Sequence, residues 1–502
     1  MTLNQEEFKS KVLGCWLGKN IGGTLGAPFE WKRQVNNVTF YTQDLHGEAM
    51  PNDDLDIQLL WLCAMEEKGI YPNSRLLAEY WCLYVTPHWA EYGTGKINLR
   101  SGLPPPLSGT FRNAYKHSCG AYIRSEIWAC IAPGLPHIAA KYAIEDALLD
   151  HGNGEGTYAE VFMAALESAA FVISDLNQLI EIGLSYIPAD CGVAKAVHMV
   201  VDCHKRKKTW LETREQLLRE HRGGLSLGNT SLEDQKKGFG EGVRGYDVPS
   251  NIGITLIGLL WGGEDFGQVQ CIAVNCGEDT DCTAATAGSV WGIIHGAAAI
   301  PQKWIDPIGR GIKTVCLNLG ELGYFGQQLP ANVDNLTERT MRIARQVLAS
   351  HGFENMCSAE PTSLKDVTPE KLMGGKTLAS LEICMRGPRF DFDCFSVYVD
   401  YGDEPVIKPG QPKTVKFTIV NTFKYQSNLG FHWYLPAGWE VSPGADGYAL
   451  SFTSWFGAPV TLEYQLKTPV VTQPTSRAVF EITIQGRPTV MLVPITLING
   501  TI

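Results

Sequence analysis

Residues 277–296 read Gly277-Glu-Asp279-Thr-Asp281-Cys-Thr-Ala284-Ala-Thr-Ala-Gly288-Ser-Val-Trp-Gly292-Ile-Ile-His-Gly296. After the acidic start, Ala284, Gly288 and Gly292 recur every fourth residue, and this spacing places them on one face of a helix. A face without large side chains lets another helix approach closely. A segment that is apolar on its other faces as well is typical of a buried helix. We therefore expect this helix to be the central one in an all-α bundle.

A second acidic helix start lies near the N-terminus. Pro51-Asn52-Asp53-Asp54-Leu55-Asp56 runs into the apolar segment 57–65, and Asn52 is a suitable N-cap. The positive end of a helix favours ionised aspartates in the first turn, so either acidic cluster alone is explained by capping. The presence of two such clusters favours a shared site.

The two clusters have the composition of a metal site. Asp279 and Asp281 precede a run of Ala and Gly, where burial is expected, and buried carboxylates need cations. No basic residue is near either cluster in the sequence. Clustered carboxylate, hydroxyl and amide oxygens suit Mg²⁺ or Mn²⁺, whereas the His/Cys spacing of a zinc site is absent.

The chain changes character once. Residues 1–353 have helical periodicity, for example in segments 158–171 and 336–348. Residues 354–385 contain prolines and a glycine pair, and we expect a linker with one short helix. From residue 386 to 502 the apolar pattern alternates, which is typical of an all-β antiparallel sandwich. The expected strands are 395–400, 414–420, 460–466, 478–484 and 490–497.

Composition excludes several classes of protein. The 502 residues carry 42 Lys+Arg and 53 Asp+Glu, a net charge of -11, and no dense basic block, so we expect no nucleic-acid binding. The longest apolar run, 252–261, is too short to span a bilayer, and no signal pattern opens the chain. The 14 cysteines lack disulfide-scaffold spacing and indicate free thiols in a reducing compartment, the cytoplasm.

Five motifs together resemble the ADP-ribosylglycohydrolase family, of the dinitrogenase reductase-activating glycohydrolase type, over residues 8 to 350. The family has Thr-Asp-Asp-Thr where this chain has Asn52-Asp53-Asp54-Leu55, and Gly-Gly-Asp-Thr-Asp-Thr at 277–282. The remaining motifs are a glycine-rich helix ending in Gly-x-Pro-x-Glu, a substrate-holding glycine loop and an aspartate–histidine stretch. In this chain they are Gly14 to Glu30, Gly120-Ala-Tyr-Ile-Arg124, and Glu145-Asp-Ala-Leu-Leu-Asp-His151 followed by Gly156-Thr-Tyr-Ala-Glu.

The resemblance implies an all-α catalytic domain with two Mg²⁺ or Mn²⁺ ions beside the bond at the anomeric carbon of the substrate. It assigns the catalytic roles to Glu30, as acid/base, and to Asp54 and Asp279. The residues implied as metal ligands are Asn52, Asp53, Asp54, Asp279, Asp281 and Thr283. The residues implied as substrate contacts are Gly120, Tyr122 and His151. Ordinary roles also fit these last three, because Gly120 and Tyr122 suit a turn and His151 suits a helix C-cap.

Four of the chain's departures from the family motifs bear on the candidate site. Asn52 and Leu55 replace threonines, Cys282 replaces the last threonine, and Gly23 replaces an aspartate. A thiol is a poor ligand for a hard ion, and Thr283 is turned by roughly a hundred degrees from that position. These changes suggest altered occupancy of one metal, a different substrate or lost activity.

Three functions therefore compete. The first is metal-dependent hydrolysis of an ADP-ribosyl or related ribosyl bond, in a small molecule or on a protein. The second is hydrolysis of another N- or O-glycoside, and the third is ligand binding without catalysis. The β-sandwich is expected to have a structural or interaction role, in contact with carbohydrate or protein. Five aromatic residues could form a sugar-stacking face or fill the core, and the alternation at 431–433 favours at least two of them pointing inward. They are Phe431, Trp433, Tyr434, Trp439 and Trp455.

Overall fold

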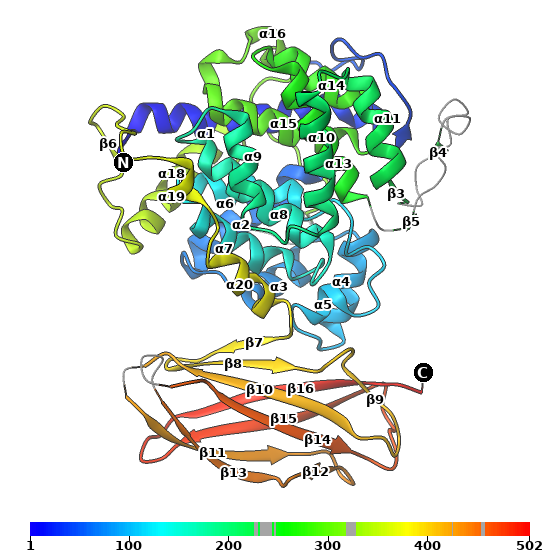
Figure 1. The fold of residues 1–502 in the computed structure, drawn as a ribbon, viewed down its shortest axis with the longest axis vertical. Coiled ribbons are helices and arrows are strands. Elements are labelled where there is room, and N and C mark those ends of the chain that lie inside the picture. The colour runs from blue at the N-terminus through cyan, green and yellow to red at the C-terminus, as the bar shows by residue number, and fades with distance from the viewer. Residues whose placement is uncertain are drawn as a thin grey trace.

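The protein has a helical body followed by a β-domain. A computed structural model describes residues 1–224, 229–230, 243–244, 247–317, 328–423, 425–452 and 457–501. Figure 1 shows the helices packed together above two layers of strands. The prediction of an all-α domain followed by an antiparallel β-domain is confirmed.

The helical body is built from helices of very different lengths, joined by short turns and by longer connections such as the one between η1 and α2. Its helices are α1 (Gln5–Gly26), α2 (Asp53–Lys68), α3 (Ser74–Tyr84), α4 (Ala90–Arg100), α5 (Leu107–Thr110), α6 (Glu126–Ile131), α7 (Pro136–Ala147), α8 (Glu155–Ala170), α9 (Leu176–Leu184), α10 (Gly192–Lys205), α11 (Trp210–His221), α13 (Val248–Gly262), α14 (Phe266–Asn275), α15 (Thr280–His295), α16 (Gln302–Ile305) and α18 (Val333–Ser350). The 3-10 turns are η1 (Ala27–Phe29), η2 (Tyr122–Arg124) and η3 (Ala297–Ala299). Two-residue strand pairs are β1 (Leu3–Asn4) with β6 (Cys357–Ser358), β2 (Lys32–Arg33) with β4 (Asn229–Thr230), and β3 (Gly223–Gly224) with β5 (Val243–Arg244).

Helices α1 and α15 lie against each other, antiparallel, at backbone contact (Figure 1). A Cβ atom on Gly18 would lie 2.1 Å from the carbonyl oxygen of Gly288, and one on Gly22 would lie 2.3 Å from that of Ala284. In the opposite direction, a Cβ on Gly292 would lie 2.1 Å from the oxygen of Gly14. The prediction of a central buried helix is confirmed, since residues 280–293 of α15 are all buried. We call this contact the glycine seam.

The segment expected to be a linker is structured. It contains β6, α19 (Pro369–Leu372) and α20 (Thr377–Cys384), so it has two short helices where one was expected. Strand β6 pairs in parallel with β1, and the backbone N–H of Thr2 donates to the oxygen of Ser363 at 3.0 Å. The segment therefore packs along the helical body instead of bridging open space.

The β-domain consists of two facing sheets. Their strand orders are β12-β14-β10-β8-β7 and β13-β11-β15-β16-β9. The strands are β7 (Arg389–Asp391), β8 (Phe395–Asp400), β9 (Val406–Ile407), β10 (Lys413–Asn421), β11 (Ser427–Tyr434), β12 (Glu440–Ser442), β13 (Asp446–Ser451), β14 (Val460–Lys467), β15 (Thr475–Ile484) and β16 (Val490–Asn499). All five predicted strands are present, and the pairings are antiparallel except for β9 with β16.

The aromatic residues proposed for stacking divide between the core and the surface of the β-domain. Phe431 and Trp433 point into the space between the sheets and are buried, so they fill the core. Tyr434 is exposed, and Trp439 packs partly against the core. Trp455 lies outside the described residues. The core aromatics are thus unavailable for sugar stacking.

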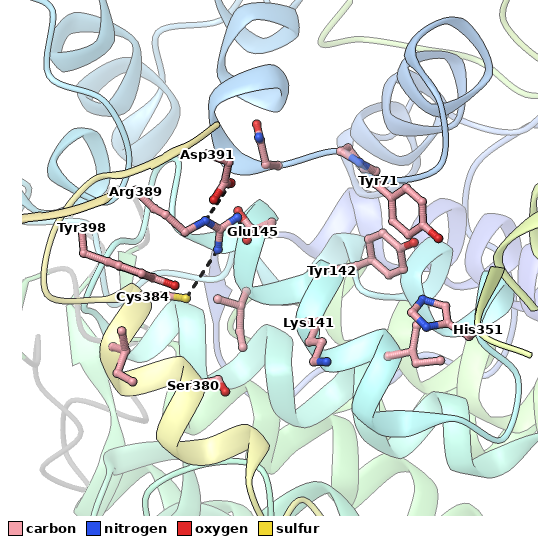
Figure 2. A pocket seen from close by; sticks show the side chains of 15 residues that line it. Tyr71, Lys141, Tyr142, Glu145, His351, Ser380, Cys384, Arg389, Asp391 and Tyr398 are labelled. Carbon is pink, nitrogen blue, oxygen red and sulfur yellow. Dashed lines mark hydrogen bonds and ion pairs between the residues drawn. The ribbon is translucent and has the colours of Figure 1, made fainter. Parts of the chain in front are cut away.

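The β-domain is docked on the helical body through apolar and ionic contacts. Leu103, Leu107 and Phe111 join the hydrophobic core of the sandwich. A cavity of about 540 Å³ lies at this junction. Figure 2 shows Arg389 of β7 approaching Glu145 of α7 there. The Arg389–Glu145 ion pair measures 2.6 Å. The ion pair fastens the β-domain to α7, the helix that also carries Asp146.

Within the described residues, no helix is both long and apolar enough to cross a membrane. The segment 252–261 lies in α13, which is buried within the bundle. The fourteen cysteines are free thiols, and most are buried.

The glycine seam predicts a sharp stability effect. Gly18→Ala should lower the free energy of unfolding by about 1–3 kcal/mol or more, because its methyl group would overlap the backbone of Gly288. Gly311→Ala is the matched control, since a Cβ there would meet nothing within 4 Å, and it should change stability by less than about 0.5 kcal/mol. Denaturant unfolding measures both variants. Equal stability of the two would contradict the close contact.

Candidate active site

Two helix starts and one loop bring acidic side chains to one place. Helix α15 begins after its N-cap Asp279, and α2 begins after Asn52, whose side-chain oxygen accepts from the N–H of Asp54 at 2.9 Å. Glu30 follows η1 at the end of α1. Ligand atoms of Glu30, Asp279 and Asp281 lie within 4.8 Å of one another. We call the side chains of Glu30, Asp53, Asp54, Asp279 and Asp281 the acidic cluster.

Several oxygens of the acidic cluster are buried without a hydrogen-bond partner. Asp54 is fully buried and neither of its carboxylate oxygens has a partner. One oxygen each of Asp279 and Asp281 is in the same situation. An unpaired buried carboxylate is strongly unfavourable, so this arrangement requires either protons or cations.

Burial and mutual repulsion raise the pKa values of the cluster. The pKa of Glu30 rises to about 8, mainly through burial and then through the charges of Asp279 and Asp53. Burial likewise raises the pKa of Asp54 to about 7, with Lys19 opposing the shift. The pKa of Asp281 is well above its usual range because of burial and the charge of Glu30. The cluster is therefore poised to accept positive charge.

One buried lysine borders the cluster, and it was missed in the sequence. Lys19 of α1 is fully buried and forms an ion pair of 2.7 Å with Glu126. Its positive charge opposes the rise in the pKa values of Asp54 and Asp53. A basic residue therefore does lie near the acidic helix starts in space, although none is near them in the sequence. Lys19 precedes Asp53 by many residues, and only the packing of α1 brings the two together. Its partner Glu126 balances its charge, which leaves the acidic cluster with a net deficit of cations.

The loop before α15 is held by buried arginines. Glu278 has a positive φ of 67° and pairs with Arg33 at 3.1 Å and with Arg222 at 2.8 Å. Gly277 has a φ of 74°, and a Cβ there would lie 2.1 Å from the oxygen of Gln34. Only glycine fits this position. The loop thereby fixes where Asp279 and Asp281 enter the site.

Four members of the acidic cluster, all except Asp54, line a cavity of about 610 Å³. This volume is in the range of small-molecule sites. Besides the acids, its walls carry aromatic rings and the segment Ser118-Cys119-Gly120. The aromatic lining residues are Trp31, Trp89, Tyr92 and Tyr115.

Two residues with strained backbone angles line this cavity. Trp31 has a φ of 60° and Ala90 a φ of 33°, and both line the cavity. Non-glycine residues rarely adopt such angles, and they are frequent at functional sites. The strained turns direct Trp31 and the neighbouring Trp89 toward the cavity. Neither tryptophan was singled out in the sequence, because isolated aromatics carry no local signal.

The predicted glycine loop forms one wall of the cavity and is anchored by Arg124. Arg124 is fully buried and donates to the oxygen of Gly120 at 2.8 Å. It also pairs with Asp146 at 2.8 Å and with Asp150 at 2.7 Å. A Cβ on Gly120 would lie 2.1 Å from Glu91, so the loop passes close to that side chain.

His151 is placed behind the cavity wall. Its Nδ1 lies 2.9 Å from Asp150, and its Nε2 lies 3.2 Å from the hydroxyl of Ser118. Ser118 lines the cavity, whereas His151 does not. His151 thus reaches the cavity only through Ser118, and its ring pairs with side chains instead of capping carbonyls.

The other predicted residues differ in whether they line the cavity. Asp53 lines the cavity, and Asn52 caps α2 beside Gly23, where a Cβ would lie 1.6 Å from the amide nitrogen of Asn52. Tyr122 is fully buried and does not line the cavity. Thr283 donates its hydroxyl to the backbone oxygen of Thr280 at 3.4 Å.

The donor set fits a divalent cation. Carboxylates converge on shared space, several of their oxygens are orphaned, and the nearby lysine is already paired. Oxygen-rich sites of this kind bind Mg²⁺ or Mn²⁺. The residues best placed to hold such ions are Asp54, Asp279 and Asp281, with Glu30 and Asp53 beside them.

Comparisons with known proteins point to one family. A family model described as ADP-ribosylglycohydrolase matches residues 4–340. ADP-ribosylarginine hydrolase Tri1 of Serratia proteamaculans (strain 568) is 35% identical over 49 residues, which are 10% of this chain and only 13% of that protein. A solved ADP-ribosylglycohydrolase-related protein complex has a TM-score of 0.40 at 18% identity, covering 68% of this chain and 99% of that chain.

Removing the anchor of the glycine loop should destabilise the protein. Arg124→Ala leaves Asp146 and Asp150 buried without their cation, and should cost about 3–5 kcal/mol of unfolding free energy. Arg206→Ala, which breaks an exposed pair with Asp202, should cost less than about 1 kcal/mol. Denaturant unfolding compares the two. A loss in Arg124→Ala no larger than in Arg206→Ala would show that Arg124 anchors nothing.

Proposed function

Because this chain belongs to the ADP-ribosylglycohydrolase family, we propose that it hydrolyses the glycosidic bond between ADP-ribose and a side chain or small group, using a divalent metal pair. The first substrate to test is ADP-ribosylated arginine, the substrate class in the name of the Serratia relative. One observation carries the proposal. Orphaned carboxylate oxygens of Asp279 and Asp281 lie at the wall of a ligand-sized cavity, and the orphaned carboxylate of Asp54, fully buried and not itself part of the lining, lies next to Asp281.

The acidic cluster would hold the metal ions through Asp54, Asp279 and Asp281, with Asp53 and Asn52 at the start of α2. A bound divalent pair supplies orientation of a ribose diol, a lowered pKa of water and stabilisation of developing charge. The protein contributes a fixed donor geometry. The loop before α15 and the cap of α2 hold the carboxylates in place before any ligand enters.

Glu30 is the proposed general acid/base. It lines the cavity, half-buried, beside Asp279 and Asp281, where a carboxyl group is within reach of a bound ligand. It can therefore deliver a proton to the leaving group or take one from the attacking water. Asp54 and Asp279, the other two predicted catalytic residues, would act by holding charge.

The remaining cavity walls suit a nucleotide-like ligand. Trp31 and Trp89 present rings on which a planar base can stack. The segment 118–120 brings a hydroxyl and backbone groups to the opposite part of the lining, supported by Arg124. In this proposal Gly120 contacts the substrate directly, whereas His151 acts through Ser118 and Tyr122 supports the loop from within.

Replacing the proposed acid/base should reduce turnover specifically. Glu30→Gln should lower kcat for ADP-ribose release from ADP-ribosylated arginine by about 10²–10⁴-fold. Glu382→Gln, at an exposed position on α20, should leave kcat unchanged. Unaltered kcat in Glu30→Gln would refute the assigned role. Wild-type turnover of another N- or O-glycoside alone would favour the second function, and ligand binding without turnover the third.

Metal removal should be visible as a change in stability. Mn²⁺ at about 100 times its Kd should stabilise the metal-free protein by about 2.7 kcal/mol. Asp281→Asn should lose this stabilisation, yet the metal-free variant should unfold at a higher temperature than metal-free wild type, because one repelling charge is gone. The exposed Asp190→Asn should behave like wild type. Thermal unfolding with and without a chelator measures all three, and an unchanged response in Asp281→Asn would contradict the ligand assignment.

A further inference from the structure

A sulfur atom belongs to the acidic cluster. The Sγ atom of Cys282 and one carboxylate oxygen each of Asp54 and Asp281 all lie within 4.8 Å of one another. All three side chains are more than nine-tenths buried. Asp281 is shared with the all-oxygen group that includes Glu30 and Asp279, so the structure contains two neighbouring groups of different chemistry.

The orphaned oxygens of the sulfur-containing group indicate that it needs a cation. Both oxygens of Asp54 and one of Asp281 are buried without a hydrogen-bond partner. The adjacent Lys19 amine is already engaged by Glu126 and by the hydroxyl of Thr286. A cation at this position would therefore have to come from solution.

Cys282 lies at the start of a helix, next to the carboxylates of this group. It occupies the first turn of the 16-residue helix α15, directly after Asp281. A thiol in this setting becomes a strong ligand only when a metal ion replaces its proton.

Building on the proposed metal-dependent function, we propose that the Asp54–Asp281–Cys282 position binds a thiophilic divalent ion, of the Zn²⁺ or Co²⁺ class, in preference to Mg²⁺. The neighbouring Asp279–Asp281 position, which Glu30 borders, keeps the preference of an all-oxygen site for Mg²⁺ or Mn²⁺. On binding, the Cys282 Sγ–H bond breaks, the sulfur–metal bond forms, and the proton passes to solvent. The protein thus carries a mixed pair of ions.

A second thiol in the cavity provides the matched control. Cys119 lines the same cavity and is buried near Asp279, yet it is not a member of either ligand group. It matches Cys282 in burial and differs in position. A metal signal that depends on Cys282 but not on Cys119 therefore distinguishes coordination from the mere presence of a nearby thiol.

The test is titration of the metal-stripped, full-length protein with Co²⁺, monitored by the near-ultraviolet charge-transfer band between thiolate and cobalt. Wild type and Cys119→Ser should develop the band, which Zn²⁺ abolishes and excess Mg²⁺ does not. Cys282→Ser and Cys282→Thr should lack it, with circular dichroism confirming that they are folded. Cys282→Thr, which restores an oxygen, should bind Mg²⁺ more tightly by calorimetry.

The proposal is overturned if wild type shows no band, if the band persists in both Cys282 variants, if it is lost only in Cys119→Ser, or if excess Mg²⁺ removes it. Hydrolysis by the Mg²⁺- or Mn²⁺-loaded protein without any cobalt band would leave the proposed function standing and refute this inference alone. A Cys282-dependent band without hydrolysis under any metal would support this inference and refute the proposed function.

Discussion

The backbone contact between α1 and α15 is the constraint on which the candidate site depends. Gly14, Gly18 and Gly22 meet Gly292, Gly288 and Ala284 at distances that leave no room for a side chain on the glycines. Because the two helices are antiparallel, the C-terminal end of α1 meets the N-terminal end of α15. Glu30 is thereby brought to Asp279 and Asp281. A wider separation of the helices would move the acids apart.

This close packing opposes strong electrostatic repulsion. Several carboxylates share one buried region, and their pKa values rise accordingly. The surrounding structure compensates with directed contacts, such as the pairing of Glu278 with Arg33 and Arg222. A bound cation would neutralise the remaining negative charge. The repulsion that strains the metal-free protein is therefore also the source of its metal affinity. The same logic explains the high density of buried ion pairs behind the cavity wall.

The sequence predicted those features that are encoded locally. The cap of α2 by Asn52, the buried helix after Asp279 and the five alternating strands all follow from short-range patterns, and the structure has each of them. The contacts of Lys19 and Arg222 could not be predicted, because their partners are distant in sequence. The docking of residues 354–385 was hidden by prolines and glycines that usually mark loops. The site roles of Glu30, Gly120 and His151 rested on motif order, and their chemistry stays a prediction.

The central claim is that the acidic cluster holds metal ions and that these ions are needed to bind the substrate. Isothermal titration of metal-stripped protein with ADP-ribose, with and without Mn²⁺, tests it most directly, alongside an Asp279→Ala/Asp281→Ala variant. We expect wild type to bind ADP-ribose only when metal is present, and the variant not to bind it. Equal binding without metal, or no metal binding by wild type, would contradict it.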